Sequence, residues 1–381
     1  MYSILSGIKH ENHDQMLKKI IPFFILLSLS DFSEAQVNEA KNNLTNQNIS
    51  DKQANLIFEA ASVYPNQTQF SIAIIRNGSI NYYGIIREND TIDTYDNQDR
   101  IFEIGSISKV FTSTLLAKLV NEGKFQLDDP VNDFIDLPLY NNVRISFKEL
   151  ANHTSGIPRM PSNFAASSIM DPGNPYKNYT DEKLEEYMTE QLQLNQEPGA
   201  KYEYSNVAAG FLGYVLCKIE DTDYQNLVTE KIFTKYGMTR STTHREDIQD
   251  FLVIGLNDRG IEVSNWDLSS LVGAGGILSN VEDLSKFALA QFDITNKELS
   301  LTREKTFTIN DQMDIGLGWH ILKSDSDDMI YWHNGGTGGY RSSMALNINQ
   351  KNAIIILTNV SAFNSHSQNI DKLCFDLMKT L

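Results

Sequence analysis

Segments with the pattern of β-strands occur near both ends of the chain, whereas the middle has mainly helical patterns. Residues 70–76 and 79–86 are rich in Ile and Tyr and flank Asn77-Gly78, a dipeptide that favours a tight two-residue hairpin turn. Further strand patterns occur at 329–332, 342–348 and 353–359. One sheet built from both ends, with the helical middle as an insertion, is the simplest fold that satisfies this order.

The remaining patterns are helical, with apolar residues three to five positions apart. We therefore expect an α/β (α+β) fold in which helices flank an antiparallel sheet. The expected helices are 51–63, 106–122, 181–194, 207–220, 224–235, 281–292 and 365–378. The expected parts are an N-terminal extension with a signal peptide at 1–35, a sheet domain of 36–130 with 265–381, and a mainly helical inserted domain at 131–264.

The composition excludes several classes of protein. The chain has 381 residues, of which 41% are hydrophobic and 21% charged. These values exclude disordered and collagen-like chains and allow one large or two ordinary domains of about 150 residues each. Acidic residues outnumber basic ones by 49 to 32, giving a formal net charge of −17. Because this charge repels a phosphate backbone, we expect no nucleic-acid partner.

An apolar run near the N-terminus has the features of a secretory signal. Two lysines precede the run at 20–29, and the small side chains of Ser33 and Ala35 allow cleavage between Ala35 and Gln36. The run is shorter than the about 20 residues that a spanning helix needs. We therefore expect an exported protein, periplasmic or secreted, with no stable membrane span after cleavage.

Two alternatives at the N-terminus stay open. The run could be a single-pass anchor, whereas a lipoprotein is excluded because no Cys follows it. Met16, just before the basic pair, is an alternative start to Met1.

Neither cysteines nor histidines suggest a metal site. Cys217 and Cys374 lie far apart among apolar residues, so we expect free thiols. The seven histidines include no pair at i, i+4 with an acid between them. The glycine-rich segments at 273–276 and 335–339 lack nucleotide-binding signatures. We expect no metal and no organic cofactor.

The segment Ser106-Ile107-Ser108-Lys109 begins one of the expected helices. Residues i and i+3 share a helix face, so the Lys109 amine should lie about one turn from the Ser106 hydroxyl. Unpaired N–H groups at a helix N-terminus also favour developing negative charge at Ser106. Alone, the pair is more often a cap and a solvated lysine, so it needs support from elsewhere in the chain.

Two further motifs supply this support: Tyr204-x-Asn206, just before an apolar helix, and His333-x-Gly335 in a glycine-rich stretch. In order and separation the three resemble the Ser-x-x-Lys, Tyr-x-Asn and Lys/His-x-Gly motifs of the penicillin-recognising serine hydrolase superfamily. A tyrosine in the second motif is typical of its class C β-lactamase and D,D-peptidase-like branch. Similar stretches occur at 127–130, 150–158 and 273–279, so the resemblance runs from about residue 50 to the C-terminus. It implies a serine β-lactamase/D,D-peptidase-like fold.

The resemblance also implies catalytic roles. Ser106 is expected to form a covalent acyl-enzyme, with Lys109 and Tyr204 jointly as base and proton shuttle, and His333 as a further catalytic residue. The pKa values of the amine and of the phenol must both fall to serve near neutral pH. Burial lowers the pKa of a lysine and raises that of a tyrosine, so which of them is the base stays open.

The substrate-binding residues implied by the resemblance are Asn206, Asn334 and Gly335. Asn206 has an alternative role as a cap of the helix that begins at Val207. The backbone N–H groups of Ser106 and Gly336 are expected to form an oxyanion hole.

His333 stands where β-lactamases carry a lysine. A histidine of ordinary pKa is only about a tenth protonated at pH 7.5, which weakens the positive charge expected to bind a β-lactam carboxylate. We therefore rank a D,D-peptidase, D-aminopeptidase or esterase activity on a small-molecule or peptide substrate above a class C-type β-lactamase. An exported binding or sensing module without catalysis is the alternative of another class. The sequence does not identify the substrate or the oligomeric state.

Overall fold

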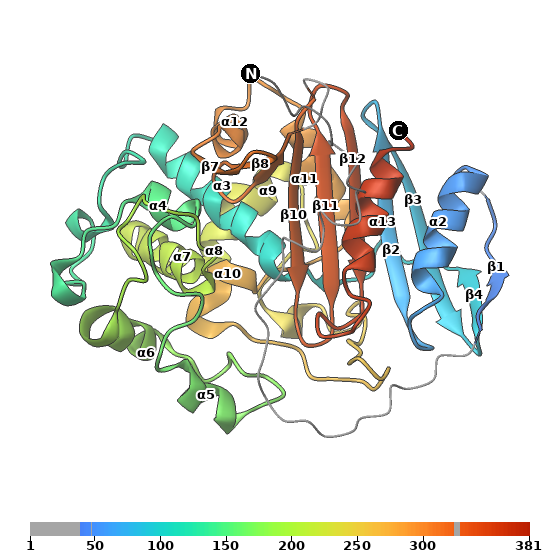
Figure 1. Ribbon diagram of the computed structural model, residues 1–381, viewed down its shortest axis with the longest axis horizontal. Coiled ribbons are helices and arrows are strands. Elements are labelled where there is room, and N and C mark those ends of the chain that lie inside the picture. The colour runs from blue at the N-terminus through green and yellow to red at the C-terminus, as the bar shows by residue number, and fades with distance from the viewer. Residues whose placement is uncertain (1–38, 47, 324–327) are drawn as a thin grey trace, which may run out of the picture. The chain divides into compact units, whose positions relative to one another are not determined.

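Both ends of the chain contribute to one ten-stranded sheet (Figure 1). The computed structural model describes residues 39–46, 48–323 and 328–381. The strand order is β1-β4-β3-β2-β12-β11-β10-β9-β8-β7, and among the described strands only the pair β1–β4 is parallel. The strands are β1 Lys41–Asn43, β2 Gln69–Arg76, β3 Ser79–Glu88, β4 Thr91–Thr94, β7 Phe307–Asn310, β8 Met313–Ile315, β9 His320–Leu322, β10 Ile330–Gly336, β11 Arg341–Asn347 and β12 Asn352–Thr358. The mixed fold of sheet and helices confirms the expected class.

The pairing of β2 with β12 joins the first hairpin to the end of the chain. The hairpin turn forms at Asn77-Gly78, where both residues have positive φ, as the sequence predicts. β12 is buried along its whole length because helices cover both of its faces.

Alternate residues of β12 contact different helices. Ile354 and Ile356 share a core with Leu373 of α13 (Asn369–Met378), which packs with α2 (Asp51–Ala61). The neighbouring residues of the strand face the second core, on the side of α11 (Val281–Gln291). Helices from the two ends of the chain, α2 and α13, therefore cover one face of the sheet together, and α11 covers the other face.

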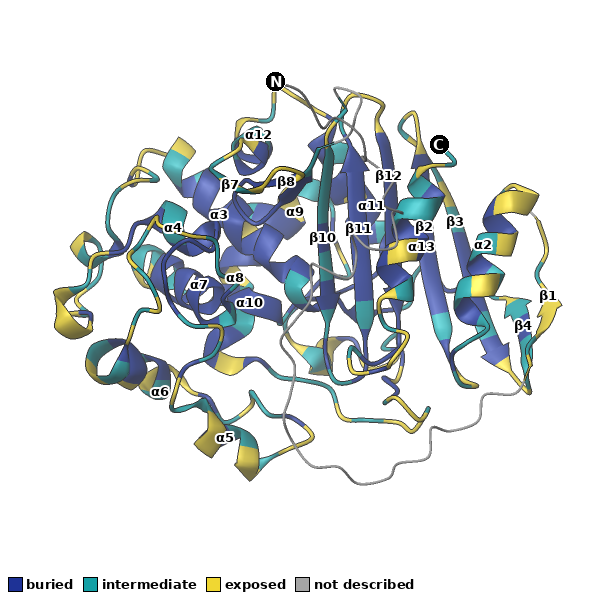
Figure 2. Cartoon of the chain, in the orientation of Figure 1, coloured by how far each residue is buried: buried dark blue, intermediate teal, exposed yellow. Residues whose placement is uncertain are grey.

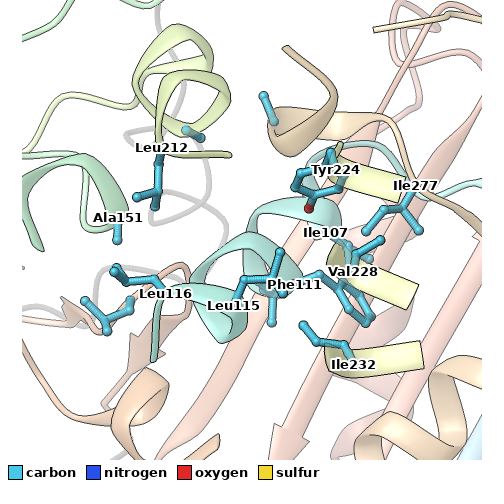
Figure 3. Close-up of a cluster of buried hydrophobic side chains, with 14 of the residues drawn as sticks. Ile107, Phe111, Leu115, Leu116, Ala151, Leu212, Tyr224, Val228, Ile232 and Ile277 are labelled. Carbon is cyan, nitrogen blue, oxygen red and sulfur yellow. The ribbon is translucent and has the colours of Figure 1, made fainter. Parts of the chain in front are cut away.

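The helix α3 (Ser108–Asn121) is buried along most of its length (Figure 2). Around Phe111, the side chains of Val228, Ile232 and Ile107 form a continuous apolar cluster (Figure 3). Truncating a buried phenylalanine of this kind to alanine costs about 3–5 kcal/mol. This packing holds the first turn of α3 in a defined position.

The segment 131–264 contains helices but none of the named strands of the structure. α7 (Asn206–Glu220) packs against α3 and α10 (Val272–Gly275), which brings the middle of the chain next to the first turn of α3. The division into a sheet domain and an inserted domain at 131–264 stays a prediction. The other helices here are α4 Phe147–Ala151, α5 Phe164–Met170, α6 Asp181–Glu186, α8 Tyr224–Val228 and α9 Thr234–Tyr236.

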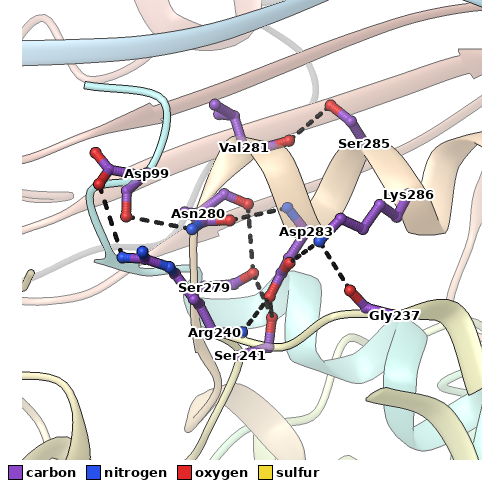
Figure 4. A network of polar contacts seen from close by, with 10 residues as sticks. All are labelled: Asp99, Gly237, Arg240, Ser241, Ser279, Asn280, Val281, Asp283, Ser285 and Lys286. Atoms are coloured by element: carbon purple, nitrogen blue, oxygen red, sulfur yellow. Dashed lines mark hydrogen bonds and ion pairs between the residues drawn. The ribbon is translucent and has the colours of Figure 1, made fainter. Parts of the chain in front are cut away.

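A buried carboxylate joins the start of α11 to the segment 240–241 (Figure 4). Asn280 caps the helix by accepting from the Asp283 N–H at 2.8 Å. Asp283 in turn accepts from the Arg240 N–H at 2.7 Å and from the Ser241 hydroxyl at 3.0 Å. Because a buried carboxylate must be paired to be tolerated, this network joins 240–241 firmly to the helix.

Several elements differ from the sequence-based expectation. The short strands β4, β7, β8 and β9 had no clear pattern, because three or four residues show little periodicity. The seven-residue helix α12 (Lys297–Arg303) was not expected either. The expected loop at 158–179 contains α5, and the expected helices at 181–194 and 224–235 each include a π-helical turn.

The predicted signal peptide at 1–35 and its cleavage site lie outside the described residues. Among the helices that the structure describes, none combines the length and the apolar character needed to cross a membrane.

Candidate active site

Ser106 lies in a 3₁₀ turn, Gly105–Ile107, that leads directly into α3. The side chain of Lys109, in the first turn of α3, is buried at 2% exposure, and its Nζ lies 3.1 Å from Ser106 Oγ. The structure thus brings the first two predicted residues into contact at the start of the helix.

Lys109 has two further hydrogen-bond partners from distant parts of the chain. Its Nζ lies 2.9 Å from Asn206 Oδ1 and 2.6 Å from the carbonyl oxygen of Ala274 in α10. Within the described residues, no ion pair joins Lys109 to a carboxylate. Burial first, and then the positive charge of Arg159, hold the pKa of Lys109 well below its usual range.

Tyr204 completes the group around the Ser106 hydroxyl. Its ring centroid lies 4.8 Å from Lys109 Nζ. Burial raises the pKa of Tyr204 to about 12, although its side-chain hydrogen bond with Ser106 and the charge of Arg159 act in the opposite direction. The phenol therefore keeps its proton at neutral pH.

The second motif is held in place by Ser205, which caps α7. Its hydroxyl accepts from the Ala208 N–H at 2.9 Å, and its backbone N–H donates to His153 Nδ1 at 3.2 Å. Ser205, rather than Asn206, is thus the cap of this helix, so the Asn206 side chain is available to Lys109. His153 is buried and contacts the backbone of the motif, which is a structural role.

His333 lies on β10 with its side chain buried at 1% exposure. Its Nδ1 lies 2.6 Å from the Asn334 carbonyl oxygen, which assigns the proton to Nδ1 in the neutral ring, while Nε2 has no partner among the described residues. Burial, followed by the charges of His320 and Lys109, holds the pKa of His333 well below its usual range. The imidazole is therefore neutral, and its ring centroid lies 6.4 Å from that of Tyr204.

The side chain of Asn334, one of the predicted substrate-binding residues, points away from Ser106 and bonds to α13. Neighbouring residues of a strand point to opposite faces, and Asn334 Nδ2 donates to Asp371 of α13 at 2.8 Å. Arg341 forms an ion pair with the same carboxylate. The structure therefore does not bring the Asn334 amide to Ser106, and its contact with substrate stays a prediction.

The glycines of β10 approach the 3₁₀ turn very closely. A methyl group on Gly105, which has φ +51°, would lie 2.6 Å from the Gly336 nitrogen, and one on Gly335 would lie 2.0 Å from the Ile104 carbonyl oxygen. Only glycine fits at these positions.

The direction of the Gly336 N–H follows from the ladder between β10 and β11. The Thr337 N–H donates to the Tyr340 carbonyl at 2.9 Å, so the adjacent pair Gly336–Arg341 is the non-hydrogen-bonded pair of the antiparallel ladder. The N–H of Gly336 then points away from β11. Its nitrogen lies next to the turn that carries Ser106, as the predicted oxyanion hole requires.

Sequence reasoning missed two contributors to this site. The Ala274 carbonyl lies in the 273–279 stretch quoted for the family resemblance, but a backbone acceptor has no sequence signature. Arg159 directly follows the 150–158 stretch, and its guanidinium Cζ lies 5.1 Å from the centroid of the Tyr204 ring. The three buried histidines His153, His320 and His333 lie near one another, but the described residues contain no His, Cys, Asp or Glu group arranged to hold a metal.

Comparisons with known proteins agree with this geometry. The beta-lactamase family model matches residues 68–373. The D-alanyl-D-alanine-carboxypeptidase/endopeptidase AmpH of Escherichia coli (strain K12) is 28% identical over 305 residues, covering 73% of this chain and 77% of AmpH.

Solved structures share the fold. A class C beta-lactamase from Rhodobacter sphaeroides superposes with a TM-score of 0.72 at 17% identity, covering 87% of this chain and 99% of that one. A beta-lactamase/D-alanine carboxypeptidase from Pseudomonas syringae gives a TM-score of 0.69 at 20% identity, covering 86% and 96%. The family match over most of the chain, together with these relatives, establishes that the protein belongs to the beta-lactamase family and is a serine hydrolase.

Proposed function

We propose that this serine hydrolase acts as a D,D-peptidase-like enzyme through a covalent acyl-enzyme on Ser106. The observation that carries the proposal is the 3.1 Å approach of Lys109 Nζ to Ser106 Oγ, with the centroid of the Tyr204 ring 4.8 Å from the same Nζ. A nucleophile beside two groups able to move a proton is the arrangement that acyl transfer needs. The similarity to AmpH, whose name describes a D-alanyl-D-alanine carboxypeptidase, supports the substrate class.

We assign the role of base to Lys109 in its neutral form. A neutral amine has two N–H donors and one lone pair. Asn206 Oδ1 and the Ala274 carbonyl can only accept, so they take the two N–H groups and leave the lone pair for the Ser106 hydroxyl proton. The lowered pKa of Lys109 supports this protonation state.

Tyr204 is assigned as proton relay rather than as a phenolate base. With a pKa of about 12, the phenol remains protonated at neutral pH and acts as a hydrogen-bond donor. As Ser106 Oγ attacks the substrate carbonyl, the hydroxyl proton moves to Lys109. The proton then passes through Tyr204 to the leaving amine or alcohol as the bond to the acyl carbon breaks. Water repeats the same sequence on the acyl ester and releases the acid.

The developing oxyanion is assigned to the backbone N–H groups of Ser106 and Gly336. One such donor is worth roughly 3–4 kcal/mol of transition-state stabilisation. The Gly105 contact with the Gly336 nitrogen supports this pairing, because it places the two N–H groups on neighbouring backbones. Asn206 and Gly335 are proposed to contact the substrate next to this position.

A neutral, buried His333 supplies no fixed positive charge to the third motif for a substrate carboxylate. This favours an uncharged ester over a β-lactam, and the similarity to AmpH supports the peptide. We propose that His333 contributes its Nε2 lone pair to the site instead.

Labelling tests the nucleophile. A fluorophosphonate is expected to form one adduct on Ser106 and to leave Ser106→Ala unlabelled. Ser79→Ala is the control, because Ser79 is exposed at the hairpin turn, and it should be labelled to the same extent as the parent. No adduct on Ser106, together with no hydrolytic activity in the parent that Ser106→Ala removes, would favour a binding module.

A substrate panel tests the reaction. An N-acyl-D-alanyl-D-alanine peptide, a p-nitrophenyl ester and a chromogenic cephalosporin are compared by kcat/KM. Turnover of the peptide or ester is expected to exceed that of the cephalosporin, and the opposite order would establish a β-lactamase.

Export is proposed from the sequence of residues 1–35. N-terminal sequencing of the protein from the extracytoplasmic fraction is expected to begin at Gln36. Retention of Met1 there would contradict cleavage.

A further inference from the structure

Arg159 is attached directly to the second motif through its backbone. Its carbonyl oxygen accepts from the N–H groups of Asn206 at 3.0 Å and Val207 at 3.4 Å, the first residues of α7. The arginine therefore occupies a fixed position relative to Tyr204 and Asn206, although its side chain is exposed.

The guanidinium of Arg159 lies over the site. Its Cζ is 5.1 Å from the centroid of the Tyr204 ring, whose centroid is 4.8 Å from Lys109 Nζ. Burial has the largest effect on the pKa values of Lys109, Tyr204 and Tyr176, lowering the first and raising the other two. The charge of Arg159 acts in the lowering direction on all three, so its field reaches three separate segments of the chain. Tyr176 and Asn206 both contact the sulfur of Met160, which lies 3.8 Å from the Tyr176 hydroxyl and 3.6 Å from Asn206 Nδ2.

The other basic groups at the site are less suited to bind an anion from solvent. Lys109 and His333 are almost fully buried. The side chain of Arg341 is only 15% exposed. Arg159 differs from these three because its side chain is exposed and lies beside the ring of Tyr204.

We infer that the Arg159 guanidinium binds a carboxylate of the substrate, so that the enzyme prefers short peptides with a free carboxylate to the corresponding amides. The planar guanidinium matches a carboxylate with two parallel N–H donors, and its cation–π contact with the Tyr204 ring keeps it beside the site. This inference rests on the proposed function for the reaction, but it concerns recognition alone. It assigns to Arg159 the anion-binding task that a neutral His333 does not perform.

Binding without turnover separates this inference from the proposed reaction. The probes are N-acetyl-D-alanyl-D-alanine and its C-terminal amide, titrated by calorimetry into the Ser106→Ala protein. We expect the acid to bind about tenfold or more tightly than the amide, because a charge-assisted hydrogen bond contributes at this level. Adding Arg159→Gln is expected to bring the two affinities together, and adding Arg159→Lys to retain part of the difference.

The control is Arg144→Gln in the same background. Arg144 is an exposed arginine paired with Asp133, so its loss removes the same charge without a contact to the site. The control is expected to keep the preference for the acid. Thermal melting of each variant establishes that it is folded.

Three outcomes overturn the inference: equal binding of acid and amide by the Ser106→Ala protein, binding of neither, or an unchanged preference after Arg159→Gln. In each of these cases the proposed reaction would still be supported if the parent hydrolyses the ester and Ser106→Ala does not. Conversely, loss of the preference in Arg159→Gln supports the inference even where the D,D-peptide is not cleaved.

Discussion

Lys109 Nζ lies 3.1 Å from Ser106 Oγ, and it is held there by acceptors from two distant segments, Asn206 and Ala274. The amine is buried and has no ion-pair partner among the described residues, which supports the proposed role of Lys109 as the base. The proposed chemistry depends on this relationship.

Replacement of Lys109 by alanine is expected to lower kcat/KM for the p-nitrophenyl ester by about 10²–10⁴-fold, because the serine loses its base. Lys118→Ala is the matched control, since this lysine lies on the same helix and is partly exposed, in an ion pair with Glu122. A Lys109→Ala enzyme with activity near that of the parent would exclude the amine as base.

The pH dependence of kcat/KM should report the Lys109 amine. Its pKa is lowered by burial and by Arg159, and activity needs the neutral form, so the rate rises as the pH passes this pKa. Arg159→Gln removes a lowering charge, so the rise should move to higher pH. Arg144→Gln should leave it in place because its charge is paired and screened. A rise that stays in place or moves to lower pH in Arg159→Gln would contradict the coupling.

Tyr204 is expected to act in its protonated form. Burial raises the pKa of Tyr204 to about 12, so the phenol keeps its proton at pH values above 10, the usual pKa of a tyrosine. We therefore expect no loss of kcat/KM between pH 8 and pH 10.5 that can be assigned to Tyr204, and about 10²–10⁴-fold lower activity in Tyr204→Phe. An alkaline loss near pH 10 that is absent in Tyr204→Phe would show a phenol with an ordinary pKa.

Gly105 offers a test of the oxyanion hole. Gly105→Ala places a methyl group 2.6 Å from the Gly336 nitrogen, so kcat/KM should fall by about 100-fold or more as that donor is displaced. Gly123→Ala is the control, because Gly123 also has positive φ, at +77°, but no atom would lie within 4 Å of its methyl group. Both variants should lose about 1 kcal/mol of unfolding free energy from backbone strain, with an additional loss from the clash at Gly105. Equal activity in the two variants would argue against the contact.

Asp283 is expected to act on stability alone. Asp283→Ala leaves the Arg240 N–H and the Ser241 hydroxyl without their acceptor, which should lower the free energy of unfolding by about 2–4 kcal/mol. The neighbouring Glu282→Ala should cost less than about 1 kcal/mol. Urea denaturation measures both, and kcat/KM of the folded Asp283→Ala protein should stay close to that of the parent. A loss no larger than that of Glu282→Ala would show that the network contributes little.

The sequence was sufficient for features that depend on neighbouring residues. The Asn77-Gly78 hairpin follows from two residues that tolerate positive φ. The contact between Ser106 and Lys109 follows from helix geometry, since i and i+3 lie on one face. The order of the three motifs also identified the family to which the chain belongs.

Tertiary structure decided the rest, because the other contacts of the site join segments far apart in the chain. Whether Asn206 caps a helix or bonds Lys109 depends on Ser205, whose hydroxyl supplies the cap. The Asn334 side chain turns toward Asp371 because neighbouring strand residues face opposite sides of the sheet. The opposite pKa shifts of Lys109 and Tyr204 arise from burial, which disfavours the charged form of each, and burial is a property of the packed molecule.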